Sequence, residues 1–264
     1  MGRMPSDRTP PGGISTRLVS LSADSADPPG INDYDSFAEA YTASNENNLI
    51  NAYYERPAML ALAGDVAGRR ILDAGCGSGP LFAALRDRGA IVTGIDKSAR
   101  MLELARRRLG DDADVQVAEL GSPLPFPDDT FDDVTASLVL HYLEDWGPAL
   151  AELRRVLKPG GRLIVSVDHP FAENLLHREA GLEPDYFATY NYVDEWTVGG
   201  QTALLSFWTR PLHAMTDAFT AAGFRITVIS EPAVAPDTPR ELLPDRIADR
   251  RRFLCFLFFV LHAS

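Results

Sequence analysis

Residues 71–79 read Ile-Leu-Asp-Ala-Gly-Cys-Gly-Ser-Gly, an apolar segment that runs into alternate glycines. The apolar residues predict the end of a buried strand, and Pro80 stands where the first residue of a helix is expected. Glycine leaves room for a ligand beside the main chain, and the start of a helix offers N–H groups that have no helical partner. The segment therefore predicts a binding loop at the end of a parallel strand.

A second predicted strand, 91–95, is followed by Asp96. An acid in that place usually binds the ribose hydroxyls of a nucleotide cofactor. The spacing of the glycines distinguishes the classes of cofactor. Counted from Gly75 and Gly77, the dinucleotide fingerprint Gly-x-Gly-x-x-Gly needs its last glycine where this chain has Pro80. The pattern present is Asp-x-Gly-x-Gly-x-Gly, which argues against a dinucleotide-dependent oxidoreductase.

At these residues the chain resembles the class I S-adenosylmethionine-dependent methyltransferases. The likeness is to their small-molecule branch, which includes domains of the ubiquinone/menaquinone-biosynthesis type. Further matching segments follow in the family's order, and the resemblance covers roughly 34–262. These segments are 94–98 (Gly-Ile-Asp-Lys-Ser), 119–120 (Glu-Leu), 124–126 (Leu-Pro-Phe), 131–134 (Phe-Asp-Asp-Val), 140–143 (Leu-His-Tyr-Leu) and 155–161 (Arg-Val-Leu-Lys-Pro-Gly-Gly).

Strand-like and helix-like segments alternate along the chain, as a parallel sheet covered on both faces requires. Strands are predicted near 70–74, 91–95, 114–118, 132–139, 162–167, 224–230 and 253–261. Helices are predicted near 47–63, 79–88, 98–109, 146–157 and 211–222, with Ser98 as an N-cap. The predicted class is α/β. The resemblance implies a Rossmann-like, seven-stranded, mostly parallel sheet with helices on both faces and an antiparallel last strand.

Composition divides the chain into a polar N-terminal segment and one domain, with an aromatic-rich stretch inside that domain. Residues 1–30 carry few large apolar side chains and no signal-peptide core, so we expect a disordered tail there. Residues 31–264 are expected to form one methyltransferase domain. Within it, the aromatic-rich stretch of about 168–210 interrupts the alternation after the fifth strand. Because it leaves the sheet at the edge where open α/β folds bind ligands, we interpret it as a lid.

Charge, cysteine content and hydropathy limit the partners and the cell compartment that we expect for the protein. The 264-residue chain has a formal net charge of −12, which disfavours a nucleic-acid partner and leaves a small-molecule acceptor. Cys76 and Cys255 make no disulfide framework, which suits a reducing cytoplasm. The apolar run 253–261 is about half of the ~20 residues that span a bilayer, so we interpret it as a buried strand and expect no membrane association.

The resemblance implies S-adenosylmethionine as the cofactor. It assigns cofactor contacts to Tyr41, Asp73, Gly75, Cys76, Gly77, Gly79, Asp96, Lys97, Met101, Glu119, Leu120 and Ser137. In this assignment Asp96 binds the ribose and Glu119 accepts from the adenine amine. Asp73 orients the glycine loop or meets the methionyl ammonium through water. The methionyl carboxylate is held by Tyr41 or by Arg56, since arginine suits carboxylate geometry.

Catalysis asks for little beyond alignment, because the methyl group of this cofactor is already electrophilic. A general base is needed only if the nucleophile keeps its proton near neutral pH, and histidine is the usual choice. The candidates are His141, after the fourth strand, and His169, at the end of the fifth. Their alternative roles are packing beside the cofactor for His141 and a simple turn for His169. No spacing of cysteine or histidine predicts a metal site.

Acceptor contacts are predicted for Tyr142, Tyr190, Trp196 and Trp208, because small-molecule pockets are mostly apolar and aromatic. The alternative is that these side chains pack on one another. The predicted function is methyl transfer to an oxygen, nitrogen or carbon atom of a small aromatic or apolar metabolite. A non-catalytic S-adenosylmethionine-binding protein and a nucleotide-cofactor oxidoreductase remain as alternatives.

Overall fold

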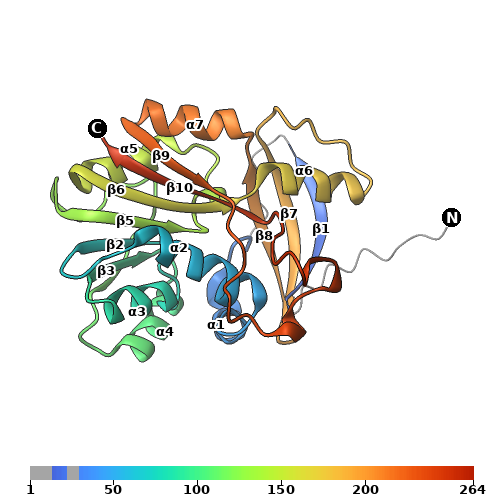
Figure 1. The fold of residues 1–264 in the computed structure, drawn as a ribbon, viewed down its shortest axis with the longest axis horizontal. Helices are drawn as coiled ribbons and strands as arrows, with labels where there is room; N and C mark the ends of the chain where they lie inside the picture. The colour runs from blue at the N-terminus through green and yellow to red at the C-terminus, as the bar shows by residue number, and fades with distance from the viewer. Residues whose placement is uncertain (1–13, 23–29) are drawn as a thin grey trace.

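The computed structural model describes residues 14–22 and 30–264 and is centred on a seven-stranded sheet of order β4-β3-β2-β5-β6-β10-β9 (Figure 1). The strands are β2 (Arg70–Ala74), β3 (Ile91–Asp96), β4 (Val115–Val117), β5 (Phe131–Ser137), β6 (Leu157–Asp168), β9 (Phe224–Ser230) and β10 (Phe256–Ala263). Strands β2 to β6 pair in parallel, whereas β10 is antiparallel to both β6 and β9. The predicted Rossmann-like sheet with an antiparallel last strand is confirmed.

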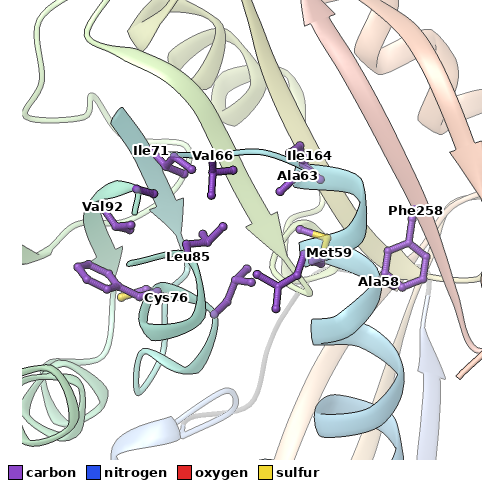
Figure 2. Close-up of a cluster of buried hydrophobic side chains, with 14 of the residues drawn as sticks. Ala58, Met59, Ala63, Val66, Ile71, Cys76, Leu85, Val92, Ile164 and Phe258 are labelled. Carbon is purple, nitrogen blue, oxygen red and sulfur yellow. The ribbon is translucent and has the colours of Figure 1, made fainter. Parts of the chain in front are cut away.

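Alternate strand residues supply two separate cores, because successive side chains of a strand point to opposite faces. Ile71 and Phe258 pack with Met59 in one cluster, shown in Figure 2. Their neighbours Leu72 and Phe259 belong to the other cluster. The first face is covered by α2 (Arg56–Ala63), α3 (Pro80–Asp87) and α4 (Ala99–Leu109), and the second by α5 (Gly147–Val156) and α7 (Leu212–Ala221). Helices therefore cover both faces, as predicted.

A second sheet, of order β1-β7-β8, lies beside the main sheet (Figure 1). It consists of β1 (Ile14–Ser22), β7 (Tyr190–Val198) and β8 (Gln201–Thr209). The hairpin between β7 and β8 turns at Gly199 and Gly200, which both have positive φ, as a two-residue hairpin turn requires. Together with α6 (Pro170–Glu179), the hairpin makes up most of the segment after β6 that the sequence predicted as a lid.

The predicted disordered tail is wrong for residues 14–22, which form β1 and pair antiparallel with β7. Leu18 and Leu21 pack against the cluster that contains Tyr192 and Phe207. Composition missed this strand because its partner lies far along the chain and its own apolar residues are few. Residues 1–13 and 23–29, the rest of the predicted tail apart from Gly30, lie outside the described residues.

Before β2, the helix predicted over 47–63 is present from 49 to 63 but includes a π-helical turn, and another helix precedes it. The region contains α1 (Ala38–Asn45), then a π-helical turn over Asn51–Glu55, then α2. Asn48 Oδ1 accepts from the Asn51 N–H at 2.7 Å, so the helix starts at this side-chain cap. The Arg56 N–H bonds the Asn51 carbonyl five residues back, which produces the π-type turn.

Element ends differ from the predictions by a few residues in two strands. Strand β6 starts at Leu157, before the predicted 162, and β10 runs to Ala263. The predicted cap of α4 is confirmed, because Ser98 Oγ accepts from the Met101 N–H at 3.0 Å. Within the described part of the chain, no helix has the length and apolar character needed to span a bilayer.

Candidate active site

A cavity of about 330 Å³ opens at the carboxyl ends of β2, β3 and β5. Its lining includes all but one of the residues predicted to bind the cofactor: Tyr41, Asp73, Gly75, Cys76, Gly77, Asp96, Lys97, Met101, Glu119, Leu120 and Ser137. The position agrees with the rule that open α/β sheets bind ligands beyond the carboxyl ends of their strands.

The glycine loop is fixed to β3 and leaves its upper side open. The N–H groups of Gly75 and Cys76 both donate to the Ile95 carbonyl, at 2.8 and 2.9 Å. Gly75 has a φ of +80°, and an added Cβ would lie 2.6 Å from Val139 Cγ2. At Gly77 an added Cβ would meet nothing within 4 Å, so this side of the loop leaves space for a ligand. Only glycine allows this close approach between the loop and Val139.

Gly79 is the predicted contact that does not line the cavity. Its φ is +79°, and an added Cβ would come within 3.0 Å of Leu109 Cδ1 and 3.5 Å of Ala105 Cβ. The third glycine is therefore required where α3 packs closely against α4, and its contact with the cofactor stays a prediction.

Asp96 is held by both of its carboxylate oxygens. Oδ2 accepts from the Gly77 N–H at 2.8 Å, and Oδ1 accepts from the Ser98 N–H at 2.9 Å. Burial raises the pKa of Asp96 above its ordinary value, although these two backbone hydrogen bonds oppose that shift. The carboxylate lines the cavity in a fixed orientation, which suits a pair of ribose hydroxyls.

Asp73 lies deeper in the same cavity and is 1% exposed. Thr135 Oγ1 donates to its Oδ1 at 2.9 Å, whereas Oδ2 is buried and has no hydrogen-bond partner among the described residues. Burial raises the pKa of Asp73 to about 7. A buried carboxylate oxygen without a partner is unfavourable unless a ligand or a water satisfies it.

Tyr41 and Arg56, the alternatives for a carboxylate ligand, are brought together at Asn45. The Arg56 guanidinium donates to the Asn45 carbonyl at 3.0 Å and to its Oδ1 at 2.7 Å. Burial raises the pKa of Tyr41 to about 12, against the effect of its hydrogen bond with Asn45. All three side chains line the cavity, so both alternatives stay open.

His141 pairs with Asp168, an arrangement that the sequence did not predict. His141 Nδ1 lies 3.0 Å from Asp168 Oδ2, and the histidine is 5% exposed. Its ring packs edge-on against Tyr142 and Phe207, at centroid distances of 4.7 and 5.3 Å. Tyr142 lines the cavity and His141 does not. His141 therefore lies behind the cavity wall, where it supports Tyr142.

His169 serves as the N-cap of α6. Its Nδ1 accepts from the Phe171 N–H at 3.2 Å, and its Nε2 lies 2.8 Å from Glu231 Oε1. It is absent from the cavity lining. Both ring nitrogens are engaged within the protein, so the geometry fits the alternative of a structural turn better than the predicted catalytic role.

Of the four residues predicted to contact the acceptor, one lines the cavity and three do not. Tyr142 lines the cavity, and its hydroxyl contacts that of Tyr34. Tyr190, by contrast, bonds His177 Nδ1 at 3.1 Å, and Trp196 packs on Phe207 at 5.8 Å between centroids. Trp208 is half-buried on β8; like Tyr190 and Trp196, it is not part of the lining. For these three the alternative of packing within the lid fits the geometry better.

Sequence reasoning missed several lining residues that precede β2, among them Asn45, Asn51 and Glu55. No motif marks them. From sequence alone, a polar residue in an amphipathic helical segment is expected to face solvent, because the elements that cover it are not known. A group of three or more His, Cys, Asp or Glu side chains placed to hold a metal ion does not occur within residues 14–22 and 30–264.

Comparison with known proteins agrees with this geometry. The family described as "Methyltransferase domain" matches residues 72–165. A demethylmenaquinone methyltransferase of Tropheryma whipplei (strain Twist) is 35% identical over 171 residues, which are 60% of this chain and 71% of that protein. The chain belongs to the class I S-adenosylmethionine-dependent methyltransferases. Its fold is that of this family.

Two further matches show how far the likeness extends. A demethylmenaquinone methyltransferase of Clavibacter sepedonicus is 42% identical over 134 residues, 50% of this chain and 55% of that protein. The chain thus spans only about half the length of that relative. The solved structure of an S-adenosylmethionine-dependent methyltransferase from Mesorhizobium loti matches with a TM-score of 0.58 and 25% identity, over 78% of this chain and 96% of that one.

The cofactor of this methyltransferase is S-adenosylmethionine, and the residues present fit it. Asp96 is oriented for the ribose, and the glycine loop leaves its upper side open. The unpartnered Oδ2 of Asp73 suits the methionyl ammonium or a water bound to it. Glu119 is exposed at the cavity rim, where it can reach an adenine amine.

Proposed function

We propose that this methyltransferase transfers a methyl group to a small aromatic acceptor of the quinol type, at a ring carbon or a hydroxyl oxygen. The relatives support this class of acceptor, because both are demethylmenaquinone methyltransferases by name. The cavity supports it as well, because its wall beyond the glycine loop carries the rings of Tyr34 and Tyr142. The observation that carries the proposal is that one cavity contains both the residues suited to the cofactor and two aromatic rings suited to the acceptor.

The reaction needs alignment more than chemical assistance from the protein. Bound S-adenosylmethionine supplies an electrophilic methyl group. Asp96 and the glycine loop hold the nucleoside part in place, and Asp73 neutralises a positive charge at the other end. The aromatic wall holds a flat ring and excludes water. Such alignment of two reactants accounts for up to ~7–11 kcal/mol of barrier reduction.

The test is a methyl-transfer assay with labelled S-adenosylmethionine and a panel of quinols, phenols, amines and carboxylic acids. We expect label in quinols or closely related phenols and little in the other compounds. Asp96→Asn should weaken cofactor binding about 10- to 100-fold, since hydrogen bonds to charged groups contribute ~1.5–3 kcal/mol. Calorimetry measures this affinity. Label found only in protein or nucleic acid would contradict the proposal.

The same assay separates the alternative functions. A binding protein without catalysis would retain calorimetric affinity for S-adenosylmethionine and transfer no label to any acceptor. A nucleotide-dependent oxidoreductase would bind NAD tightly, which the proline at position 80 disfavours.

A further inference from the structure

Glu55 is a buried carboxyl group that faces the cavity and is not among the residues proposed to bind S-adenosylmethionine. It ends the π-helical turn Asn51–Glu55, directly before α2, and is 4% exposed. Its Oε1 accepts from Ser137 Oγ and from Ser166 Oγ, each at 2.7 Å. Ser137 is the last residue of β5, and Ser166 lies near the end of β6. The carboxyl group is thereby fixed where these two strands end.

Fold stability alone does not account for an acid at this position. Burying a carboxyl group is unfavourable, and two hydroxyl donors compensate for that only in part. The nearest cation along the chain, Arg56, donates to Asn45 instead. Both serines bond the same oxygen, so the hydrogen bonds of the described residues leave Oε2 available to a ligand in the cavity. Single π-type turns are frequent at functional sites.

The order of the strands places Glu55 on the acceptor side of the cavity. Glu119 follows β4, Asp96 ends β3 and Asp73 lies on β2, so the adenine, ribose and methionyl contacts follow one another across the sheet. The next strands in this order are β5 and β6, which are the two strands that Glu55 contacts. A group beyond the methionyl end of the cofactor lies beside the methyl group to be transferred.

The groups around Glu55 permit a change of its protonation. Burial raises the pKa of Glu55 above its ordinary value, and the hydrogen bonds from Ser137 and Ser166 and the charge of Arg56 oppose that shift. Asp73 on β2 and Tyr41 on α1 also interact with it electrostatically, because the charge of Glu55 raises the pKa of both. A carboxylate with a raised pKa is a stronger base than an exposed one.

Resting on the proposed function, we propose that Glu55 is the general base of the reaction and receives the hydroxyl proton of the acceptor. The O–H bond of the acceptor breaks and its proton goes to the Glu55 carboxylate. The electron pair left on oxygen makes this oxygen, or the ring carbon next to it, the nucleophile. A bond forms from that atom to the methyl carbon as the S–CH3 bond breaks, and the electron pair of that bond stays on sulfur. When the ring carbon is the nucleophile, its hydrogen then leaves as a proton to water, and the oxygen regains a proton from Glu55, which restores the aromatic hydroxyl compound.

The test compares Glu55→Gln with the wild type and with Glu103→Gln, whose side chain is exposed on α4. Glutamine keeps an oxygen that can accept from both serines, so the fold should be retained. We expect Glu55→Gln to lower kcat about 100- to 10,000-fold, the usual size of a general-base effect. The affinity for S-adenosylhomocysteine, measured by calorimetry, should change less than about threefold. Glu103→Gln should match the wild type in both measurements.

A second acceptor separates a base from a structural residue. An acidic phenol analogue that is ionised at the assay pH has already lost its proton. With it, Glu55→Gln should lose most of its defect, and the fall in wild-type kcat at low pH should shift to the pKa of the analogue. An equal defect with both acceptors, or a loss of cofactor affinity that parallels the loss of kcat, would overturn the assignment.

Failure of the proposed function would look different. In that case the wild type itself would transfer no methyl group to any quinol or phenol while still binding S-adenosylhomocysteine. A wild type that is active on quinols and a Glu55→Gln variant that is equally active would overturn only the role of Glu55.

Discussion

Gly75 combines two requirements in one residue: a left-handed backbone and the absence of a side chain. Its φ is +80°, and an added Cβ would lie 2.6 Å from Val139 Cγ2. We predict that Gly75→Ala lowers the free energy of unfolding by more than the ~1–2 kcal/mol of a left-handed backbone alone. It should also weaken cofactor binding, because relief of the clash moves the loop or the cavity wall. Gly68→Ala is the matched control, with a φ of +74° and no atom within 4 Å of the added Cβ. It should show only the backbone cost and an unchanged Kd. Urea unfolding and calorimetry measure both effects, and equal results for the two variants would contradict the prediction.

The lid sheet is an element with its own small core, separate from the two cores of the main sheet. Phe207 of β8 is 4% exposed and packs on Tyr192, Tyr142 and Trp196, at 5.3, 5.2 and 5.8 Å between centroids. Phe207→Ala removes these contacts and should cost about 3–5 kcal/mol locally. We therefore predict faster amide hydrogen exchange in β7 and β8 and unchanged protection in β2, because the lid can open without the main sheet. Mass spectrometry of the exchanged peptides measures both regions. Uniformly faster exchange would show that lid and sheet unfold together.

Across the whole molecule, buried carboxyl groups make stability depend on pH in two opposite ways. Burial raises the pKa of Asp73 to about 7, and the pKa of Asp96 is raised for the same reason. The folded cavity therefore holds protons that the unfolded chain releases near pH 4, so stability falls as pH rises from about 4 to 7. Burial alone would also raise the pKa of Asp133, but hydrogen bonds from Arg162 and Arg69 lower it below its ordinary value. The ionised Asp133 therefore stabilises the folded protein, and this stabilisation is lost only when acid protonates the carboxylate. We predict that the cofactor-free protein is most stable at about pH 5 and less stable at about pH 8. Asp73→Asn should flatten that decline. Urea unfolding over this pH range is the measurement, and a steady rise in stability up to pH 8 would contradict the prediction.

The amino-acid sequence by itself determined the main sheet, the glycine loop and most of the cofactor cavity. These features depend on local pattern: the alternation of strands and helices, glycines where the backbone must turn, and acids directly after strands. Residues such as Asp96 and Ser98 could be assigned because their partners lie within one supersecondary unit. The packing role of the third glycine, by contrast, depends on α4, which lies further along the chain.

Only the tertiary structure decided the rest, because the deciding contacts join residues far apart in the chain. Strand β1 exists through its pairing with β7, and Asp168 contacts His141 rather than its own neighbour His169. Glu55 reads as an ordinary helix residue until β5 and β6 bring Ser137 and Ser166 to it. Burial and charge pairing are properties of the assembled fold. A side chain's residue type limits what it can do there, and its neighbours in space determine which of those roles it takes.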